Sequence, residues 1–260
     1  MTQFATAKDG VKIAYEVAGE GARTVVLVHG FASDRVQNWR APGWYQTLNG
    51  AGYRVVALDC RGHGESGKPY DPAAYSHETM AEDVIAVMEA AGLGQSLLMG
   101  YSMGGYISMS LLLRHPERFR KVVIAGVGAS YLDINAAEGA VADPQRRAMI
   151  ADALLAADPS TIANRTARDF RAFADQAGKD RRALAACMRG SRDVFSRAQL
   201  AQSQRPVLVV CGEKDVLTGP PGPLAAAFAD GRAITVPNRD HMTAVGDKVY
   251  KAAVLDFFKE

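Results

Sequence analysis

A serine framed by two glycines, between a strand-like and a helix-like segment, constrains this chain most. Residues 96–99 are apolar enough for a buried strand, and residues 106–113 have the character of a helix. Between them stands Gly100-Tyr101-Ser102-Met103-Gly104. A strand that turns sharply into a helix strains the backbone of its central residue and exposes that side chain. Ser102 is therefore the candidate nucleophile, and the Met103 N–H, an unpaired donor at the helix start, is placed to face an oxyanion.

Strand-like and helix-like segments alternate along most of the remaining chain. Residues 11–17 alternate apolar and polar side chains, which predicts a half-buried strand, and Asp9-Gly10 before them predicts a hairpin turn. Further strands are expected at residues 24–28, 53–58, 121–125, 206–211 and 232–236, and helices at residues 76–91, 221–228 and 249–258. This alternation predicts an α/β fold with a mostly parallel sheet that carries helices on both faces.

Residues 130–205 have a different character, because strand-like runs vanish and alanine and arginine dominate. Asp143-Pro144 and Asp158-Pro159 each place an N-cap residue before a proline at the first helical position. Another helix is expected at residues 181–189. We predict a core formed by residues 1–129 and 206–260, with residues 130–205 as a helical insertion. Its twelve basic and nine acidic side chains are interpreted as a solvated surface.

Charge and cysteine usage narrow the class of partner. The net charge is +2 over 260 residues, so we expect neither nucleic acid nor membrane as a partner, but a small molecule. The oligomeric state stays open. Cys60, Cys187 and Cys211 are odd in number and far apart, which favours small core residues in a reducing compartment over disulfides or zinc ligands.

Neither residues 1–10 nor the longest uncharged stretch is interpreted as a targeting or membrane segment. Residues 1–10 lack a basic start followed by an apolar run, so we expect no signal peptide and a cytoplasmic location. Residues 90–113 carry no charge and are long enough to span a bilayer. Five glycines interrupt them, so we interpret this stretch as strand, turn and helix.

The polar residues that follow the predicted strands include a complete set for nucleophilic catalysis. Loops at the carboxyl ends of parallel strands converge on one edge of the sheet. A serine hydroxyl needs a base within hydrogen-bond reach, and that base needs a third group to orient it. We assign His241 as the base, because imidazole changes charge near neutrality, and Asp215 as the group that orients it.

Two other carboxylates are alternatives to Asp215. Asp240 lies beside His241, although adjacent side chains usually point apart, and Asp133 follows the strand expected at residues 121–125. Among the remaining histidines, His29 and His63 lie in glycine-bounded turns and are expected to bond loop backbone. His77 and His115 are interpreted as surface or helix-end residues.

The order Ser, Asp, His along the chain is that of the α/β-hydrolase superfamily, which this chain resembles from about residue 4 to residue 258. The matching stretches are His29-Gly30-Phe31 with Trp39 downstream, residues 59–66, residues 100–105, residues 212–215 and Asp240-His241. The resemblance implies a sheet of roughly eight strands and a helical cap at residues 130–205. It assigns the second oxyanion donor to the Phe31 N–H and gives Ser66 a structural place in its loop.

The resemblance points to the branch with a serine nucleophile and a cap, similar to carboxylesterases. Ser102 in place of an aspartate argues against haloalkane dehalogenase and epoxide hydrolase reactions. The expected reaction is cleavage of a small carboxylic ester, lactone or thioester through an acyl-enzyme, with no metal and no cofactor. Carbon–carbon bond hydrolases usually carry a tryptophan beside the histidine, where this chain has Met242. A carbon–carbon bond hydrolase or a cofactor-free perhydrolase on the same triad, and a non-catalytic ligand receptor of the same fold, remain alternatives.

Overall fold

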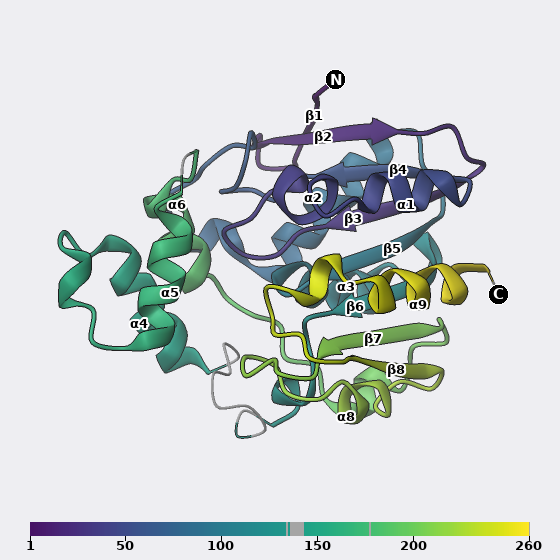
Figure 1. The fold of residues 1–260 in the computed structure, drawn as a ribbon. Coiled ribbons are helices and arrows are strands. Elements are labelled where there is room, and N and C mark those ends of the chain that lie inside the picture. Colours follow the sequence, from purple (N-terminus) through teal and green to yellow (C-terminus); the bar gives the residue numbers. More distant parts are fainter. Residues whose placement is uncertain (134, 136–142, 177, 260) are drawn as a thin grey trace.

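The fold is built on one twisted sheet, seen in a computed structural model that describes residues 1–133, 135, 143–176 and 178–259. Eight strands of the described chain lie in the order β1-β2-β4-β3-β5-β6-β7-β8 (Figure 1). The strands are β1 (Gln3–Thr6), β2 (Lys12–Ala18), β3 (Arg23–Val28), β4 (Tyr53–Leu58), β5 (Ser96–Tyr101), β6 (Phe119–Ala125), β7 (Val207–Gly212) and β8 (Gly231–Val236). This confirms the predicted sheet of roughly eight strands.

Strand directions follow the apolar pattern of the sequence. β1 and β2 form an antiparallel hairpin, in which Ala5 pairs with Ile13, and β2 runs antiparallel to β4. All other neighbours are parallel, including β3 with β5 and β6 with β7. Strands covered on both faces need apolar residues at every position, and β3 and β5 have them almost throughout.

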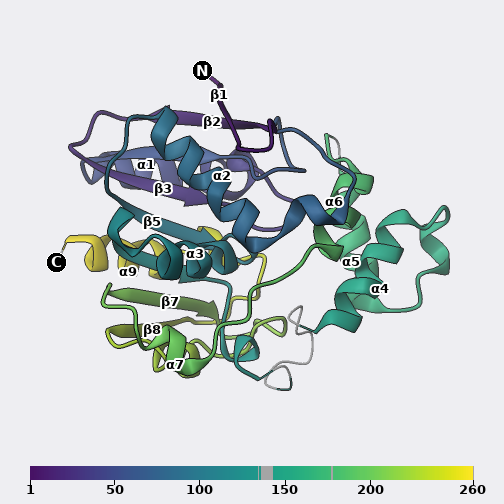
Figure 2. The same cartoon turned by 180° about the vertical axis from the view of Figure 1, so that it is seen from behind.

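Helices cover both faces of the sheet and build two apolar clusters. α1 (Trp44–Gly50) and α9 (Lys248–Lys259) lie on one face, and α2 (His77–Ala90) and α3 (Met103–Arg114) lie on the other (Figures 1 and 2). Successive residues of β3 serve the two sides, because Val25 and Leu27 join the cluster with α1 and α9, while Val26 and Val28 join the other. Each such side chain contributes about 1.5–3 kcal/mol when fully buried.

The start of α2 agrees with the helix predicted at residues 76–91. Several other short helices and turns were not predicted from the sequence. The Thr79 N–H donates to the Ser76 hydroxyl at 2.9 Å, as expected of an N-cap. The predicted helix at residues 221–228 is shorter, because α8 covers only Gly222–Ala225. Elements beyond the expectation are α1, α7 (Arg197–Leu200), a π-helical turn at Val36–Arg40 and 3₁₀ turns at Pro72–Tyr75, Pro116–Arg118, Ala129–Tyr131 and Ala244–Gly246.

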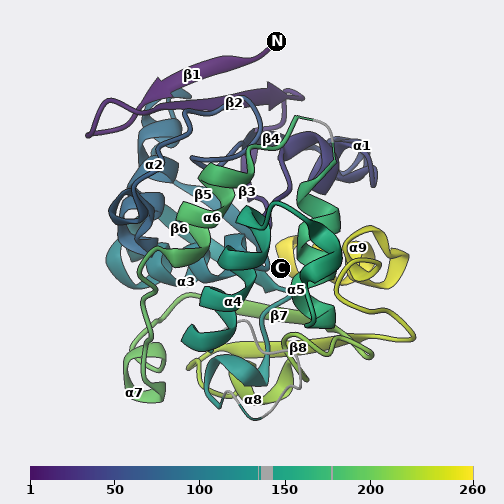
Figure 3. The ribbon, with the colours of Figure 1, turned by 90° about the vertical axis from the view of Figure 1, so that its left-hand side faces the viewer.

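Three helices between β6 and β7 lie beyond the carboxyl ends of the parallel strands (Figures 1 and 3). They are α4 (Pro144–Leu155), α5 (Arg165–Ala174) and α6 (Arg181–Arg189). Their apolar faces form a cluster of their own, with Ile150, Leu154 and Leu184 at its centre. Residues 134, 136–142 and 177 of the predicted insertion lie outside the described residues, and its division from the core stays a prediction.

One predicted helix start in this region is confirmed and one is wrong. The Gln145 N–H donates to the Asp143 carboxylate at 2.9 Å, so Asp143 caps α4 as expected. Asp158 caps only a 3₁₀ turn at Pro159–Thr161. α5 begins later, because the Asn164 side chain accepts the Ala167 N–H at 3.0 Å and supplies a competing cap.

Two further sequence features have a clear place in the structure. Cys60, Cys187 and Cys211 are buried free thiols. Residues 90–113, the uncharged stretch, comprise the end of α2, the strand β5 and most of α3. Among the helices that the structure describes, none combines the length and apolar character needed to cross a membrane.

Candidate active site

Ser102 lies at the sharp turn between β5 and α3, with a backbone conformation that few residues other than glycine adopt. Its φ is 53° and its ψ is −115°. The Ser102 N–H donates to the Ala125 carbonyl at 2.7 Å, and the Ser102 carbonyl accepts the N–H groups of Gly105 and Tyr106 at 2.8 and 3.1 Å. Hydrogen bonds on both sides therefore hold the strained turn predicted for a nucleophile.

The two glycines of the motif are required by close backbone contacts. A Cβ at Gly104 would lie 2.0 Å from the Val28 carbonyl oxygen, and a Cβ at Gly100 would lie 2.1 Å from the Gly104 carbonyl oxygen. The glycines therefore let α3 approach β3 and β5 closely.

The hydroxyl of Ser102, the imidazole of His241 and the carboxylate of Asp215 form one hydrogen-bonded chain. His241 Nε2 lies 3.0 Å from Ser102 Oγ, and His241 Nδ1 lies 2.7 Å from Asp215 Oδ2. Asp215 follows β7, and His241 lies in the loop after β8. Because Nδ1 faces a carboxylate, the neutral ring carries its proton there, and the Nε2 lone pair faces the serine.

Asp215 is held in its ionised form. Burial alone would raise the pKa of Asp215, but the charge and hydrogen bond of His241 act against burial. Further hydrogen bonds from Thr218 and from the Leu217 N–H, 3.0 Å from Oδ1, add to this and lower the pKa below its ordinary value. An ionised carboxylate at Nδ1 fixes the tautomer and stabilises the imidazolium.

The two alternative carboxylates have other partners. The Asp240 carboxylate accepts the N–H groups of Met242 and Thr243 at 3.0 and 2.8 Å, and so closes its own turn. Asp133 bonds Asn135. Within the described residues neither carboxylate is hydrogen-bonded to His241.

A tyrosine outside the predicted site fixes the loop that carries the imidazole. The Tyr101 hydroxyl donates to the His241 carbonyl oxygen at 2.5 Å, and the two rings lie 5.5 Å apart. Tyr101 is the residue before the nucleophile and is buried. The strand β5 therefore supports both ends of the Ser102–His241 hydrogen bond.

The predicted hydrogen bonds of His29 and His63 to loop backbone are confirmed. His29 Nδ1 lies 2.7 Å from the Gly30 carbonyl oxygen, and its Nε2 accepts the Cys60 N–H at 2.9 Å. His63 Nδ1 lies 2.9 Å from the Arg61 carbonyl oxygen. Both rings therefore brace the loops after β3 and β4.

Ser66 also has the structural place that the resemblance implied. Its hydroxyl donates to the Asp59 carbonyl oxygen at 2.6 Å and accepts the Ala14 N–H at 2.8 Å. The side chain is 2% exposed, so it is not available to a substrate.

The two predicted oxyanion donors lie beside the nucleophile. Phe31 follows β3, Met103 begins α3, and both line a cavity that also contains Ser102 and His241. Neither backbone N–H donates to another group within the described residues. Their role as a paired donor stays a prediction.

The cavity lined by Ser102 and His241 has a volume of about 230 Å³ and both apolar and polar lining residues. Phe31, Phe170 and Met188 form an apolar wall. His77, Arg147 and Arg192 contribute the polar side. Sequence analysis missed these three residues, and the interpretation of His77 as a surface or helix-end residue is only half right. His77 begins α2, but it is 1% exposed.

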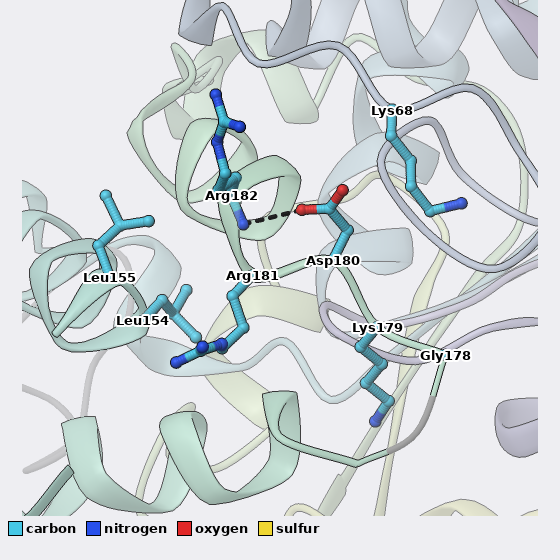
Figure 4. A pocket seen from close by; sticks show the side chains of 8 residues that line it. All are labelled: Lys68, Leu154, Leu155, Gly178, Lys179, Asp180, Arg181 and Arg182. Carbon is cyan, nitrogen blue, oxygen red and sulfur yellow. Dashed lines mark hydrogen bonds between the residues drawn. The ribbon is translucent and has the colours of Figure 1, made fainter. Parts of the chain in front are cut away.

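A second cavity, of about 550 Å³, is lined by the end of α4, the start of α6 and the loop after β4 (Figure 4). Its lining includes Lys68, Lys179 and Arg181, but no member of the triad. Figure 4 shows that the charged ends of these side chains point apart rather than toward one centre. Among the residues that the structure describes, no cluster of three or more His, Cys, Asp or Glu side chains could hold a metal ion.

Comparison with known proteins agrees with this architecture. A family model for the alpha/beta hydrolase fold matches residues 23–243. The crystal structure of a hydrolase from Pseudomonas aeruginosa superimposes with a TM-score of 0.80 at 28% identity, and covers 100% of this chain and 98% of that chain.

Two curated relatives align with most of the chain. One is the dihydrolipoyllysine-residue acetyltransferase component of an acetoin cleaving system from Pseudomonas putida, 30% identical over 88% of this chain. This chain spans only 61% of that protein's length. The other is 3-oxoadipate enol-lactonase 2 from Acinetobacter baylyi, 27% identical over 82% of this chain and 79% of the relative. Since the family model covers well over half of the residues, the chain belongs to the alpha/beta hydrolase fold family.

Proposed function

We propose that this protein is a serine hydrolase that cleaves a small carboxylic ester, lactone or thioester. The observation that carries the proposal is the chain of contacts Ser102–His241–Asp215, at 3.0 and 2.7 Å, with Ser102 and His241 on the wall of a cavity. Nucleophile, base and orienting carboxylate are the groups that acyl transfer requires. The similarity to an enol-lactonase over 82% of the chain supports the same reaction class.

The reaction proceeds in two halves that use the same base. Ser102 Oγ bonds to the substrate carbonyl carbon while its proton moves to His241 Nε2, and the Phe31 and Met103 N–H groups bind the oxyanion. The bond to the leaving alcohol or thiol breaks as His241 returns the proton to it. Water then attacks the acyl-serine, gives its proton to His241, and Ser102 leaves with that proton. Each oxyanion donor lowers the barrier by about 2.7–4 kcal/mol.

Activity-based labelling tests the proposal. A fluorophosphonate probe should modify Ser102 alone, and hydrolysis of p-nitrophenyl acetate should disappear in Ser102→Ala. Ser191→Ala is the matched control, because Ser191 is exposed and outside the cavity lining. Labelling at another residue, or hydrolysis retained in Ser102→Ala, would contradict the proposal. Tight ligand binding with negligible turnover would favour the receptor alternative.

A further inference from the structure

His77 lines the cavity together with Ser102 and His241. It is the first residue of α2 and is almost fully buried. Its ring packs against that of Tyr106, with the ring centres 5.6 Å apart, and Tyr106 lines the same cavity. A buried imidazole outside the triad therefore forms part of the wall that also carries the nucleophile.

One ring nitrogen of His77 has a partner in the protein. The Asp193 N–H donates to His77 Nδ1 at 3.3 Å. A backbone N–H can only donate, so Nδ1 is unprotonated and the neutral ring carries its proton on Nε2. Burial, together with the positive charges of Arg192 and Arg147, holds the pKa of His77 well below its ordinary value, so the ring stays neutral.

The other ring nitrogen is a buried donor without a partner. Within the described chain no group accepts a hydrogen bond from His77 Nε2. Other buried side-chain atoms of the described residues also lack partners, among them His63 Nε2 and the Tyr250 hydroxyl, but none belongs to a residue that lines this cavity. A buried donor that has lost water and gained no acceptor is unfavourable, so this N–H indicates an acceptor supplied by a ligand.

Tyr106 relates His77 to the reacting bond. The Tyr106 N–H donates to the Ser102 carbonyl oxygen at 3.1 Å, so Tyr106 lies about one turn of α3 beyond the nucleophile. One turn of helix rises about 5.4 Å. Because His77 packs against the Tyr106 ring, several atoms of a ligand would separate an acceptor at His77 from the carbonyl carbon at Ser102.

We propose that the substrate of this hydrolase carries a second oxygen a few atoms from the scissile ester, and that the His77 Nε2–H donates a hydrogen bond to it. This oxygen belongs to an ether, a hydroxyl or a ketone. The inference rests on the proposed function and names the substrate class. The cavity of about 230 Å³ suits a short ligand, and Phe31, Phe170 and Met188 in its lining offer apolar contacts to the carbon atoms of that ligand.

Esters that differ only by an oxygen in place of a methylene test the proposal. Two pairs vary the acyl side: p-nitrophenyl 3-methoxypropanoate against p-nitrophenyl pentanoate, and p-nitrophenyl 4-methoxybutanoate against p-nitrophenyl hexanoate. A third pair, 2-methoxyethyl acetate against butyl acetate, varies the alcohol side. In at least one pair kcat/KM should favour the ether ester.

Two substitutions separate the two nitrogens of the ring. Asparagine keeps an amide oxygen near the position of Nδ1 but places nothing at Nε2, whereas glutamine reaches the position of Nε2. His77→Asn should therefore lower the ether preference about tenfold, the ordinary effect of one hydrogen bond. His77→Gln should keep part of the preference but lower the midpoint of chemical denaturation, because the Asp193 N–H loses its acceptor.

His115→Asn is the matched control. His115 lies at the end of α3, where its Nε2 is 2.7 Å from Glu82, and it is outside the cavity lining. This variant should keep the native ether preference. A native enzyme without ether preference in all three pairs, or a preference that is unchanged in His77→Asn, would overturn the inference.

Spectroscopy on Ser102→Ala tests the contact without turnover. In protein labelled with ¹⁵N-histidine, the Nε2 signal of His77 should shift with at least one of methyl 3-methoxypropanoate, methyl 4-methoxybutanoate and 2-methoxyethyl acetate. The corresponding alkyl ester should leave it in place. If this holds while the native protein hydrolyses no ester, the proposed function fails and the oxygen site stands. Hydrolysis of the alkyl esters, with no ether ester shifting the signal, would reject the oxygen site alone.

Discussion

At Ser102, backbone conformation and side-chain chemistry depend on each other. A non-glycine residue in this region of φ and ψ costs about 1–3 kcal/mol, which the fixed ends of β5 and α3 offset. The same turn presents Oγ to His241 Nε2 at 3.0 Å. The strained backbone of Ser102 thus places its hydroxyl at the edge of the sheet, within hydrogen-bond distance of His241.

Removing the charge of Asp215 should separate its role from that of Asp240. Asp215→Asn should reduce kcat for p-nitrophenyl acetate by about four orders of magnitude, because an amide does not hold the productive tautomer. Asp240→Asn should change kcat by less than about tenfold, since that carboxylate closes a local turn. Steady-state kinetics on both variants decide this, and the reverse ranking would move the orienting role to Asp240.

Residues with chemistry at strand ends could be predicted from the sequence, and residues in the cavity wall could not. Ser102, Asp215 and His241 each follow an apolar run that marks a strand, so their meeting at one edge follows from sheet topology. Arg147, Arg192 and His77 reach the cavity only through the packing of α4, α6 and α2. Helical periodicity shows which face is apolar, but not which polar side chain a neighbouring helix encloses.

Among the elements, the contact of α3 with β3 and β5 depends on the absence of side chains. Gly104→Ala would drive a Cβ into the Val28 carbonyl oxygen, 2.0 Å away. We expect it to lower the free energy of unfolding by at least about 1–3 kcal/mol and to abolish esterase activity, because α3 must shift. Chemical denaturation and activity measure the two effects.

Gly50→Ala is the control for this substitution. Gly50 is exposed at the end of α1, and an added Cβ would meet nothing within 4 Å. It should leave activity unchanged and stabilise the fold by up to about 1 kcal/mol through reduced chain entropy. Equal destabilisation by both substitutions would contradict a steric role for Gly104.

Strands were easier to predict than short helices for a physical reason. Buried parallel strands need apolar residues at every position, which leaves a visible run such as residues 24–28. α1 starts after Gly43, with no side-chain cap, and spans only seven residues. Its stability comes from Trp44 and Leu48, which are buried against the sheet and α9. α5 starts six residues after the expected proline, since Asn164 caps it instead.

For the molecule as a whole, buried neutral histidines link stability to pH. Burial and the charge of His29 lower the pKa of His63 from 6.5 to about 3, and burial likewise lowers the pKa values of His29 and His77. The unfolded chain therefore binds more protons than the folded protein between these values. The stability that these histidines contribute is fully present above their pKa in the unfolded chain. It is lost as the pH falls toward their lower pKa values in the folded protein.

Denaturation at a series of pH values should show this loss. Each such histidine contributes a slope of up to about 1.4 kcal/mol per pH unit below pH 6.5. Asp83 opposes it in part, because burial raises its pKa to about 6 and the folded state then takes up a proton. His63→Gln should reduce the slope of the unfolding free energy against pH by up to about 1.4 kcal/mol per pH unit, which corresponds to one bound proton. A midpoint independent of pH between 7 and 5 would contradict the linkage.

The hydroxyl of Tyr101, bonded to the His241 carbonyl oxygen at 2.5 Å, has a mechanical consequence. Strand β5 anchors the nucleophile through the peptide chain and the base through this phenol. When β5 shifts, Ser102 and His241 move with it together. The distance between Ser102 Oγ and His241 Nε2 therefore changes little when the strands of the sheet move relative to one another. Adaptation to substrates of different shape is then left to the helices carrying Arg147 and Phe170, which can be exchanged during evolution without resetting the catalytic chemistry.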